Sequence, residues 1–505
     1  MAIELTRRDA IRGAAGLATL GAAGALVSST ARAEEAPTYE YAKAPADVAS
    51  LEQLSCDVLV IGGGGAGICA SLAASQAGAK VVICEKLGML GGATILSGGK
   101  IPAVGTKQQI ERGEQDTVRA NAQDIFRPNN YSVREDLVYT VAERGRDMIE
   151  WTEGFGVTWT LDKTLYYGQS AYRMHTADGA GAGLTQTLID TMDADANIEQ
   201  HLDTEIKGLV VDGDAVVGAY GDDLAITARN VVLATSGFGN NDEMIAQYMP
   251  EAAPAYKVVA PGATGEGIKW AAELGADLQC MGAWQGYAFH DVDNDKGVEQ
   301  GIFNNGGIAV NLDGRRFMNE YGGYSELTPH ILAQPEHIAF MVFTDEQVAK
   351  SAGYEGWQEA GIVYDGASVE ELAGVIGVDA EALAATIAAY QAGIDAGEDV
   401  FNRTKLPAGF EPPYHALKIT GEIRHTQGGA VTDVACHVLR ADGTLIKGLY
   451  AAGGCTEGFS SRGGAAYMSG NGLIQALVFG RIAGENAATE DPASAQPVIW
   501  AGPQE

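Results

Sequence analysis

The feature that most constrains this chain is a glycine-rich turn between two apolar runs near residue 60. Residues 56–86 read CDVLVIGGGGAGICASLAASQAGAKVVICEK, with short apolar runs at 58–61 and 81–84. Four glycines follow the first run, and an alanine-rich stretch then leads to the second run. This order predicts a buried strand, a tight turn, a helix and a second strand.

The turn has the glycine spacing of a site for dinucleotide phosphates. Gly62 permits the tight turn, Gly64 lets the backbone approach a pyrophosphate, and Gly67 lets the helix pack against the strand. The helix N-terminus attracts the phosphate charge. Glu85 ends the second run 18 residues after Gly67, where it can accept hydrogen bonds from ribose hydroxyls. Strand, helix and acid together predict a dinucleotide-binding domain.

A second glycine-rich stretch, LGMLGGATILSGGK (87–100), follows the predicted ribose-binding acid directly. A nicotinamide enzyme would not need this second backbone cradle, so FAD is the favoured dinucleotide. The segments ARNVVLATSGFGNNDEM (228–244), PGATGEGIKWAAELGA (261–276) and GLYAAGG (448–454) occur further along. With these segments, residues 54–488 resemble the FAD-binding family of soluble fumarate reductases, succinate dehydrogenase flavoproteins and 3-ketosteroid dehydrogenases.

The resemblance implies an α/β fold, in which a Rossmann-like FAD-binding domain carries an inserted α+β capping domain that closes over the flavin. It assigns residues 51–280 and 426–488 to the FAD-binding domain, 281–425 to the capping domain and 489–505 to a tail. The residues expected to bind FAD lie in or beside the glycine-rich segments: Gly62, Gly64, Ala66, Gly67, Glu85, Lys86, Gly92, Ala93, Thr94, Gly98, Gly99, Ala234, Thr235, Gly237, Gly454, Gly472 and Leu473.

The first 33 residues have the pattern of a Tat export signal. Twin arginines, Arg7 and Arg8, precede a short run of alanine, glycine and leucine, and Ala31-Arg32-Ala33 fits a cleavage site. Residues 34–50 then have the composition of a linker. We expect export by the Tat pathway to the periplasm or the cell envelope, with the FAD already bound.

Composition excludes some classes of protein and site. Acidic residues outnumber basic ones by 66 to 33, so the negative field would repel nucleic acid. The six cysteines include no C-x-x-C pair, no zinc spacing and no haem-attachment run. We therefore expect no bound metal, and we expect electrons to come from an external carrier such as a membrane-associated cytochrome or a quinone-linked protein.

The fumarate reductases of this family hold their dicarboxylate with histidines and arginines, and the resemblance places those positions on this chain. The lid motif R-F-x-N-E is present at 316–320, and the second substrate histidine is His425. The remaining cation positions hold other residues: Trp284, Tyr324, Val348 and Tyr467. Tyrosine is neutral at pH 7 and cannot pair bidentately with a carboxylate, so fumarate is a poor substrate candidate.

The same changes resemble the 3-ketosteroid dehydrogenases. There, N-E-x-x-x-Y supplies a proton-transferring tyrosine, here Tyr324, and a second tyrosine, here Tyr467, polarises the substrate ketone with a backbone N–H. The second motif is shifted to Y-x-x-G-x-G in this chain, which leaves the backbone donor open. His425 and Arg462 complete the expected catalytic set, and Arg315, Arg316 or Arg462 could lower the pKa of Tyr324 or hold a substrate carboxylate.

The sequence predicts an exported FAD-dependent oxidoreductase acting on CH–CH bonds. In the preferred interpretation it reduces a C=C bond conjugated to a carbonyl, in an enone, an enoate or a steroid-like small molecule, and Tyr324 transfers the proton. Two alternatives are a ketosteroid-type dehydrogenase that runs oxidatively and a fumarate-reductase-like reductase of an unsaturated carboxylate. A further alternative is a flavin-bearing electron carrier without an enzymatic activity.

Overall fold

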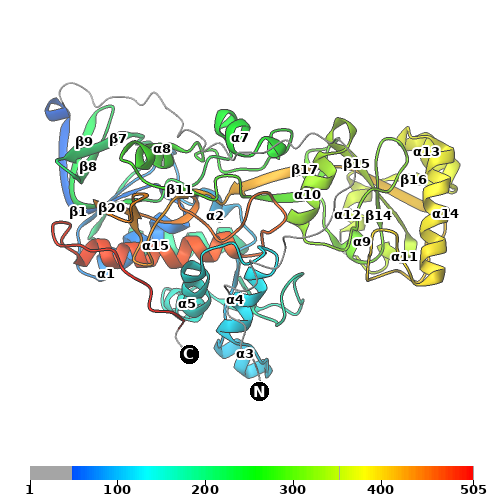
Figure 1. The fold of residues 1–505 in the computed structure, drawn as a ribbon, viewed down its shortest axis with the longest axis horizontal. Coiled ribbons are helices and arrows are strands. Elements are labelled where there is room, and N and C mark those ends of the chain that lie inside the picture. Colours follow the sequence, from blue (N-terminus) through cyan, green and yellow to red (C-terminus); the bar gives the residue numbers. More distant parts are fainter. Residues whose placement is uncertain (1–47, 352, 504–505) are drawn as a thin grey trace, which may run out of the picture. The chain divides into compact units, whose positions relative to one another are not determined.

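The computed structural model describes residues 48–351 and 353–503, and these described residues belong to one compact unit (Figure 1). The predicted signal peptide and residues 34–47 of the predicted linker lie outside the described residues. Within the part of the chain that the structure describes, no helix has both the length and the apolar character needed to cross a membrane.

The first sheet is built around parallel strands, as the glycine-rich turn predicts. Strand β1 lies between β2 and β9, and both neighbours run parallel to it. The sheet order is β19-β20-β8-β9-β1-β2-β6, with β7 paired to β8. The strands are β1 (Glu52–Ile61), β2 (Val81–Cys84), β6 (Ile198–His201), β7 (Ile206–Asp212), β8 (Ala215–Gly221), β9 (Leu224–Leu233), β19 (His437–Leu439) and β20 (Leu445–Ala451). This topology confirms the predicted Rossmann-like α/β domain.

The register of this sheet brings the predicted cofactor segments to one edge. Ile61 of β1 is level with Cys84 of β2 and Leu233 of β9, and Leu233 is level with Ala451 of β20. The residues that follow, including Gly62, Glu85, Ala234 and Gly454, therefore leave the sheet together. Ligands of open α/β sheets bind outside the carboxyl ends of such strands.

Two helices from opposite ends of the sequence pack closely on this sheet, and Figure 1 shows them side by side: α1 (Gly65–Gln76) and α15 (Asn471–Thr489). Small residues allow the approach. A Cβ on Gly480 would lie 2.4 Å from the carbonyl oxygen of Ala66, and a Cβ on Gly484 would lie 2.1 Å from that of Ala70. This packing ties the 467–472 segment to the glycine-rich turn.

Shorter strands and several helices complete the half of the molecule that contains the first sheet. A three-stranded sheet holds β3 (Lys100–Pro102), β5 (Met174–Ala177) and β4 (Trp159–Leu161), and β11 (Leu278–Gln279) pairs with β18 (Gly429–Ala430). The helices are α2 (Gly92–Ile95), α3 (Lys107–Arg112), α4 (Val118–Phe126), α5 (Glu135–Glu153), α6 (Ala180–Asp193), α7 (Asp242–Tyr248) and α8 (Glu266–Glu273).

A second, largely antiparallel sheet is formed mainly by residues between 284 and 426. Its order is β13-β12-β17-β15-β14, and β10 and β16 also pair with the long strand β17. The strands are β10 (Tyr256–Lys257), β12 (Trp284–Asp291), β13 (Lys296–Gly297), β14 (Ile308–Val310), β15 (Ile338–Thr344), β16 (Tyr364–Gly366) and β17 (Tyr414–Thr426). The helices are α9 (Gly301–Asn304), α10 (Tyr324–Leu332), α11 (Asp345–Val348), α12 (Tyr354–Glu359), α13 (Val369–Ile376) and α14 (Ala380–Ala396). The domain boundaries at 280, 425 and 488 stay a prediction.

Two polar contacts join the sheets near the end of β17. The Oγ1 atom of Thr426 accepts a hydrogen bond from the amide of Phe238 at 3.2 Å, and Gly237 leaves space for it. The hydroxyl of Ser325, the second residue of α10, donates to the carbonyl of Gly464 at 2.7 Å. The end of β17, the start of α10 and the loop before α15 therefore meet.

Candidate active site

The glycine-rich turn has no room for a side chain at Gly62 or Gly67. Gly62 has a φ of +107°, and a Cβ there would lie 2.4 Å from the carbonyl oxygen of Ala234. A Cβ on Gly67 would lie 1.9 Å from the carbonyl oxygen of Gly62. Helix α1 begins after Gly64 without a side-chain cap, which leaves helix N–H groups for an anion. These features fit a dinucleotide pyrophosphate.

Glu85 is fixed at the edge of the turn. Its two carboxylate oxygens accept hydrogen bonds from the amides of Gly63 at 2.7 Å and Leu87 at 2.9 Å. A carboxylate has further lone pairs that can accept from ribose hydroxyls. Lys86, also expected at the cofactor, donates to Thr264 at 2.6 Å and pairs with Glu266 at 2.9 Å. Its contact with FAD stays a prediction.

The second glycine-rich stretch packs directly on the first. Gly64 and Gly91 form a β-bridge, and the hydroxyl of Thr94 accepts a hydrogen bond from the amide of Gly65 at 3.2 Å. A Cβ on Gly92 would lie 2.9 Å from the Cα atom of Gly64. Ala93 lies in α2, and Gly98 and Gly99 precede β3. The second backbone cradle expected from the sequence thus lies beside the first.

The later segments line the same edge. The amide of Ala234 donates to the carbonyl of Ile61 at 2.8 Å, and a Cβ on Gly454 would lie 3.0 Å from the amide nitrogen of Gly237. Thr235 lies against Gly267, whose Cβ would be 2.2 Å from its hydroxyl. Gly472 and Leu473 belong to the first turn of α15. This set of close backbone approaches fits FAD, which would be held by these segments.

A cluster of aromatic residues lies where the two sheets meet. Tyr324 is the first residue of α10, and its ring centre lies 6.5 Å from that of Tyr467 and 5.5 Å from that of Tyr287 on β12. The ring of His425 on β17 meets the Tyr467 ring edge to face, with centres 5.4 Å apart. The structure thus brings Tyr324, Tyr467 and His425 together, as the resemblance implies.

Tyr467 and His425 are both held in their neutral forms. Burial raises the pKa of Tyr467 well above its usual value, and its hydroxyl accepts a hydrogen bond from the amide of Gly472 at 3.2 Å. Burial lowers the pKa of His425 to about 4, and the Gln427 side chain lies 2.9 Å from its Nδ1 atom. A Cβ on Gly472 would lie 2.5 Å from the His425 ring, so glycine is needed there.

Tyr324 is also kept protonated. Burial raises its pKa, and the hydrogen bonds with Ser469 and Gln285 and the positive charge of Arg424 offset this only in part. The Gln285 side chain donates to the hydroxyl at 3.4 Å. The expectation that Arg315, Arg316 or Arg462 lowers this pKa is wrong, because the pKa is raised and the arginine that acts on it is Arg424.

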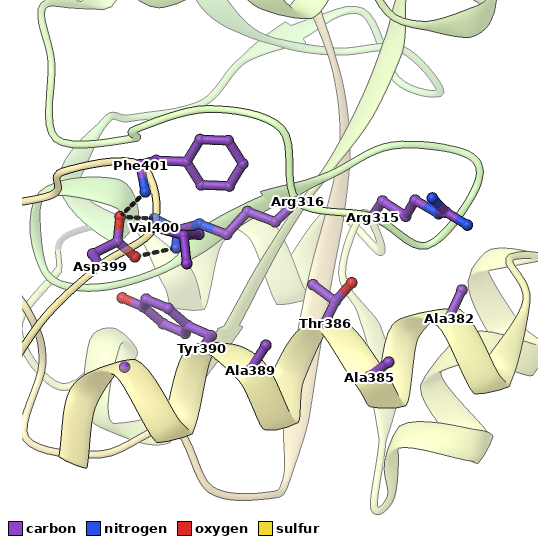
Figure 2. Close-up of a pocket in the computed structure, with 11 residues that line it drawn as sticks. Arg315, Arg316, Ala382, Ala385, Thr386, Ala389, Tyr390, Asp399, Val400 and Phe401 are labelled. Atoms are coloured by element: carbon purple, nitrogen blue, oxygen red, sulfur yellow. Dashed lines mark hydrogen bonds and ion pairs between the residues drawn. The ribbon is translucent and has the colours of Figure 1, made fainter. Parts of the chain in front are cut away.

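The side chain of Arg316 is engaged in ion pairs within the predicted capping domain. It forms ion pairs with Glu320, at 2.7 Å, and with Asp399, and its guanidinium lies 4.6 Å from the ring centre of Tyr390. Arg316 and the exposed Arg315 both line a cavity of about 420 Å³ along α14, and Figure 2 shows their side chains extending in different directions. Since Glu320 lies four residues before Tyr324, this network fixes the segment that leads into α10.

The other candidate positions from the sequence are Arg462, Trp284 and Val348. Arg462 is exposed, packs its stem against Gly282 and has no ion pair among the residues that the structure describes, so its catalytic role stays a prediction. Trp284 is fully buried, and Val348 packs against the hydrophobic core of the second sheet. The sequence reasoning missed Gln285, Tyr287, Arg424 and Ser469. These four residues lie close to Trp284, His425 or Tyr467 in the sequence, and this closeness could have identified them.

Comparison with known proteins places the chain in a family. The family described as FAD binding domain matches residues 57–473. The chain belongs to this FAD-binding family. A probable fumarate reductase of Shewanella frigidimarina is 34% identical over 444 residues, which cover 85% of this chain and 74% of that protein. FAD is therefore the cofactor.

Two solved structures resemble this member of the FAD-binding family. The open conformation of a flavocytochrome c3 fumarate reductase has a TM-score of 0.76 and 32% identity, and the match covers 87% of this chain and 79% of that one. A 3-ketosteroid-Δ4-(5α)-dehydrogenase from Rhodococcus jostii, in complex with 4-androstene-3,17-dione, has a TM-score of 0.74 and 27% identity, with coverages of 86% and 97%. The chain is an FAD-dependent oxidoreductase of the fumarate reductase and ketosteroid dehydrogenase family.

Proposed function

We propose that the enzyme reduces a C=C bond conjugated to a carbonyl group, with Tyr324 as the proton donor and Tyr467 as the donor to the carbonyl oxygen. The observation that carries the proposal is a pair of protonated tyrosines, the partly buried Tyr324 and the buried Tyr467, whose ring centres are 6.5 Å apart. The raised pKa keeps Tyr324 protonated, so that a proton is present to be transferred, and leaves little phenolate to act as a general base. The reductive direction is therefore preferred.

The proposed chemistry needs two donors besides the cofactor. When bound and reduced by the electron carrier, the flavin would supply the hydride that the β carbon of the substrate needs. Tyr467 donates a hydrogen bond to the carbonyl oxygen, where negative charge develops, and Tyr324 gives a proton to the α carbon. The neutral His425 packs against Tyr467 and fixes its ring. Arg462 remains a candidate for a substrate contact.

The substrate is proposed to be a small enone or enoate rather than fumarate. Positions that carry cations in the fumarate reductases carry Tyr324 and Tyr467 here, and neutral phenols do not balance a dianion. An oxidative reaction of the ketosteroid dehydrogenase type is a second candidate, because the same two tyrosines match that pattern. It would require the Tyr324 pKa to fall when substrate and cofactor are bound.

The twin-arginine segment at 1–33 supports the proposal that the enzyme is exported by the Tat pathway and acts in the periplasm or the cell envelope. An external electron carrier, such as a membrane-associated cytochrome or a quinone-linked protein, would then reduce the flavin. The absence of a haem-attachment run in the sequence supports an external source of electrons.

The test is an anaerobic screen of the reduced holoprotein against enones, 3-ketosteroids, cinnamates and fumarate, with flavin reoxidation as the signal. We expect reoxidation by at least one class of unsaturated monocarbonyl compound. Reduction of the oxidised flavin by saturated ketosteroids, with no reoxidation by any enone or enoate, would instead support the oxidative candidate.

A further inference from the structure

Strand β17 has a bulge at Arg424, one residue before His425. Gln285 of β12 pairs with His425, but the next residue, Gly286, pairs with Ile423, so Arg424 has no partner on β12. Bulges of this kind re-aim a side chain and are frequent beside active sites. The side chain of Arg424 therefore has a direction that the regular alternation of side chains along a β-strand would not give it.

The guanidinium of Arg424 is held in place from one side. Its Nε atom lies 2.5 Å from one carboxylate oxygen of Glu422, and the other oxygen lies 2.9 Å from Nδ1 of His290. The guanidinium also lies over the ring of Tyr287, 4.6 Å from its centre, and that ring is 5.5 Å from the ring of Tyr324. Arg424 is thus one aromatic ring away from the proposed proton donor.

The terminal nitrogens of Arg424 have no hydrogen-bond or ion-pair partner among the residues that the structure describes. Arg424 pairs with Glu422 through Nε alone, whereas both terminal nitrogens of Arg316 are engaged, by Glu320 and Asp399. The free N–H groups of a guanidinium match the two oxygens of a carboxylate. The free N–H groups of Arg424 are therefore suited to bind an anion that enters the cluster of tyrosines.

The charge of the whole chain makes such a local cation necessary for an anionic substrate. With 66 acidic and 33 basic residues, the molecule repels anions at long range. A neutral ketone would leave the terminal nitrogens of Arg424 without a carboxylate partner, since Glu422 pairs with its Nε atom alone. A dianion would place its second charge among neutral tyrosines, where nothing compensates its desolvation.

We propose that Arg424 binds the anionic group of the substrate, so that the substrate class is an unsaturated carbonyl compound with one negative charge on a flat apolar body. The inference rests on the proposed function, because it concerns the same site. The rings of Tyr287, Tyr324 and Tyr467 supply the apolar faces against which such a body packs. Arg424 is a specificity-determining residue in this account.

The experiment compares trans-cinnamate with cinnamamide, which have nearly the same shape and differ in charge. The ratio of kcat/KM for the acid to that for the amide is measured anaerobically with a reduced viologen dye. The holoproteins are the wild type, Arg424→Gln, Arg424→Lys and a control, Lys418→Gln. The control removes a cation from the same strand, where Lys418 pairs with Asp293 at 3.1 Å.

We expect the ratio to fall about 10- to 100-fold in Arg424→Gln, the range for a lost charge-assisted hydrogen bond. Arg424→Lys should lose less, because it keeps the charge without the planar fork. Lys418→Gln should keep the wild-type ratio. An unchanged ratio in Arg424→Gln overturns the proposal, and so does an equal loss in Lys418→Gln, which would indicate a general field effect.

A binding measurement separates this inference from the proposed function. The oxidised holoproteins are titrated with 3-phenylpropanoate and with its amide, and the flavin absorbance reports binding. If the wild type reduces neither cinnamate nor its amide, but Arg424→Gln weakens binding of the acid selectively, the proposed reaction fails for this pair and the anion site stands. If the wild type reduces both and only Arg462→Gln lowers the acid preference, the reaction stands and Arg424 is not the anion site.

Discussion

The amide of Gly472 donates a hydrogen bond to the hydroxyl of Tyr467, with 3.2 Å between the two heavy atoms. Gly472 is the second residue of α15, so this N–H is one of the donors that a helix start leaves without an internal partner. The bond occupies a lone pair of the phenol oxygen and leaves its O–H free to donate elsewhere. The positive end of the helix also favours negative charge beside Tyr467. A carbonyl oxygen placed there would gain from both effects.

Replacement of Tyr467 by phenylalanine tests this role. Loss of one hydrogen-bond donor to a developing oxyanion lowers kcat by about 100- to 1,000-fold in other enzymes, and we expect a loss of that size. Flavin content should stay at the wild-type level. Tyr364→Phe is the matched control, because the hydroxyl of Tyr364 bonds to Asp293, away from the cluster. Equal rates in the two variants would remove Tyr467 from the mechanism.

Replacement of Tyr324 by phenylalanine tests the proton donor. We expect a loss of about 100- to 10,000-fold in kcat, the usual contribution of a general acid. In D₂O the wild type should place deuterium on one face of the α carbon, because a fixed side chain delivers it. The residual product of the variant should carry deuterium on both faces, delivered by solvent. Single-face deuteration that persists in the variant would point to a different donor.

The glycine-rich turn predicts a specific loss of cofactor. Gly67→Ala would place a Cβ 1.9 Å from the carbonyl oxygen of Gly62, so the turn must open or the helix must move. We expect purified Gly67→Ala to contain little FAD, measured as the ratio of flavin to protein absorbance. Gly374→Ala in α13 is the control, because its Cβ would meet nothing within 4 Å. A full flavin content in Gly67→Ala would contradict the placement of the pyrophosphate at this turn.

Two histidines, the fully buried His175 and the partly buried His425, predict acid sensitivity. Burial lowers the pKa of both His175 and His425 to about 4, whereas an unfolded histidine titrates near 6.5. The unfolded state therefore binds more protons between these values, and stability falls as the pH decreases from about 6.5 to about 4. Each residue contributes on the order of 3 kcal/mol to this loss. Above pH 6.5 both are neutral in both states and contribute no pH dependence.

Urea unfolding of the wild type and His175→Asn across pH 4–8 measures this dependence. His175 is the better site for the substitution, since its bonds to Thr106 and to the carbonyl of Arg173, both 2.9 Å, lie outside the tyrosine cluster. The variant should be less stable at neutral pH but lose less stability on acidification. Parallel curves for the two proteins would show that His175 is not held neutral.

The sequence predicted the cofactor half of the molecule well, because the geometry of a glycine turn is local. Gly62, Gly67 and Glu85 take positions that their spacing and their neighbouring strands determine. The tyrosines of the cluster were found through the family resemblance, since no local pattern joins Tyr324 to Tyr467 across more than a hundred residues.

Other parts of the site depend on packing that no local pattern encodes. The bulge that gives Arg424 its orientation arises from the pairing of β12 with β17, and a strand pattern alone does not reveal it. The sequence left open whether Arg316, the arginine of the lid motif, acts on Tyr324. In the structure Arg316 pairs with Asp399, which lies 83 residues away in the sequence. The raised pKa of Tyr324 likewise results from burial between two sheets.

We propose that a pair of protonated tyrosines replaces the charged site of a fumarate reductase. The rate of flavin reoxidation tests this proposal when the anaerobically reduced holoprotein is mixed with fumarate or with an unsaturated monocarbonyl compound identified in the screen. We expect rapid reoxidation by the monocarbonyl compound, slow reoxidation by fumarate, and loss of the rapid reaction in Tyr324→Phe. Rapid reoxidation by fumarate that persists in Tyr324→Phe would contradict this proposal.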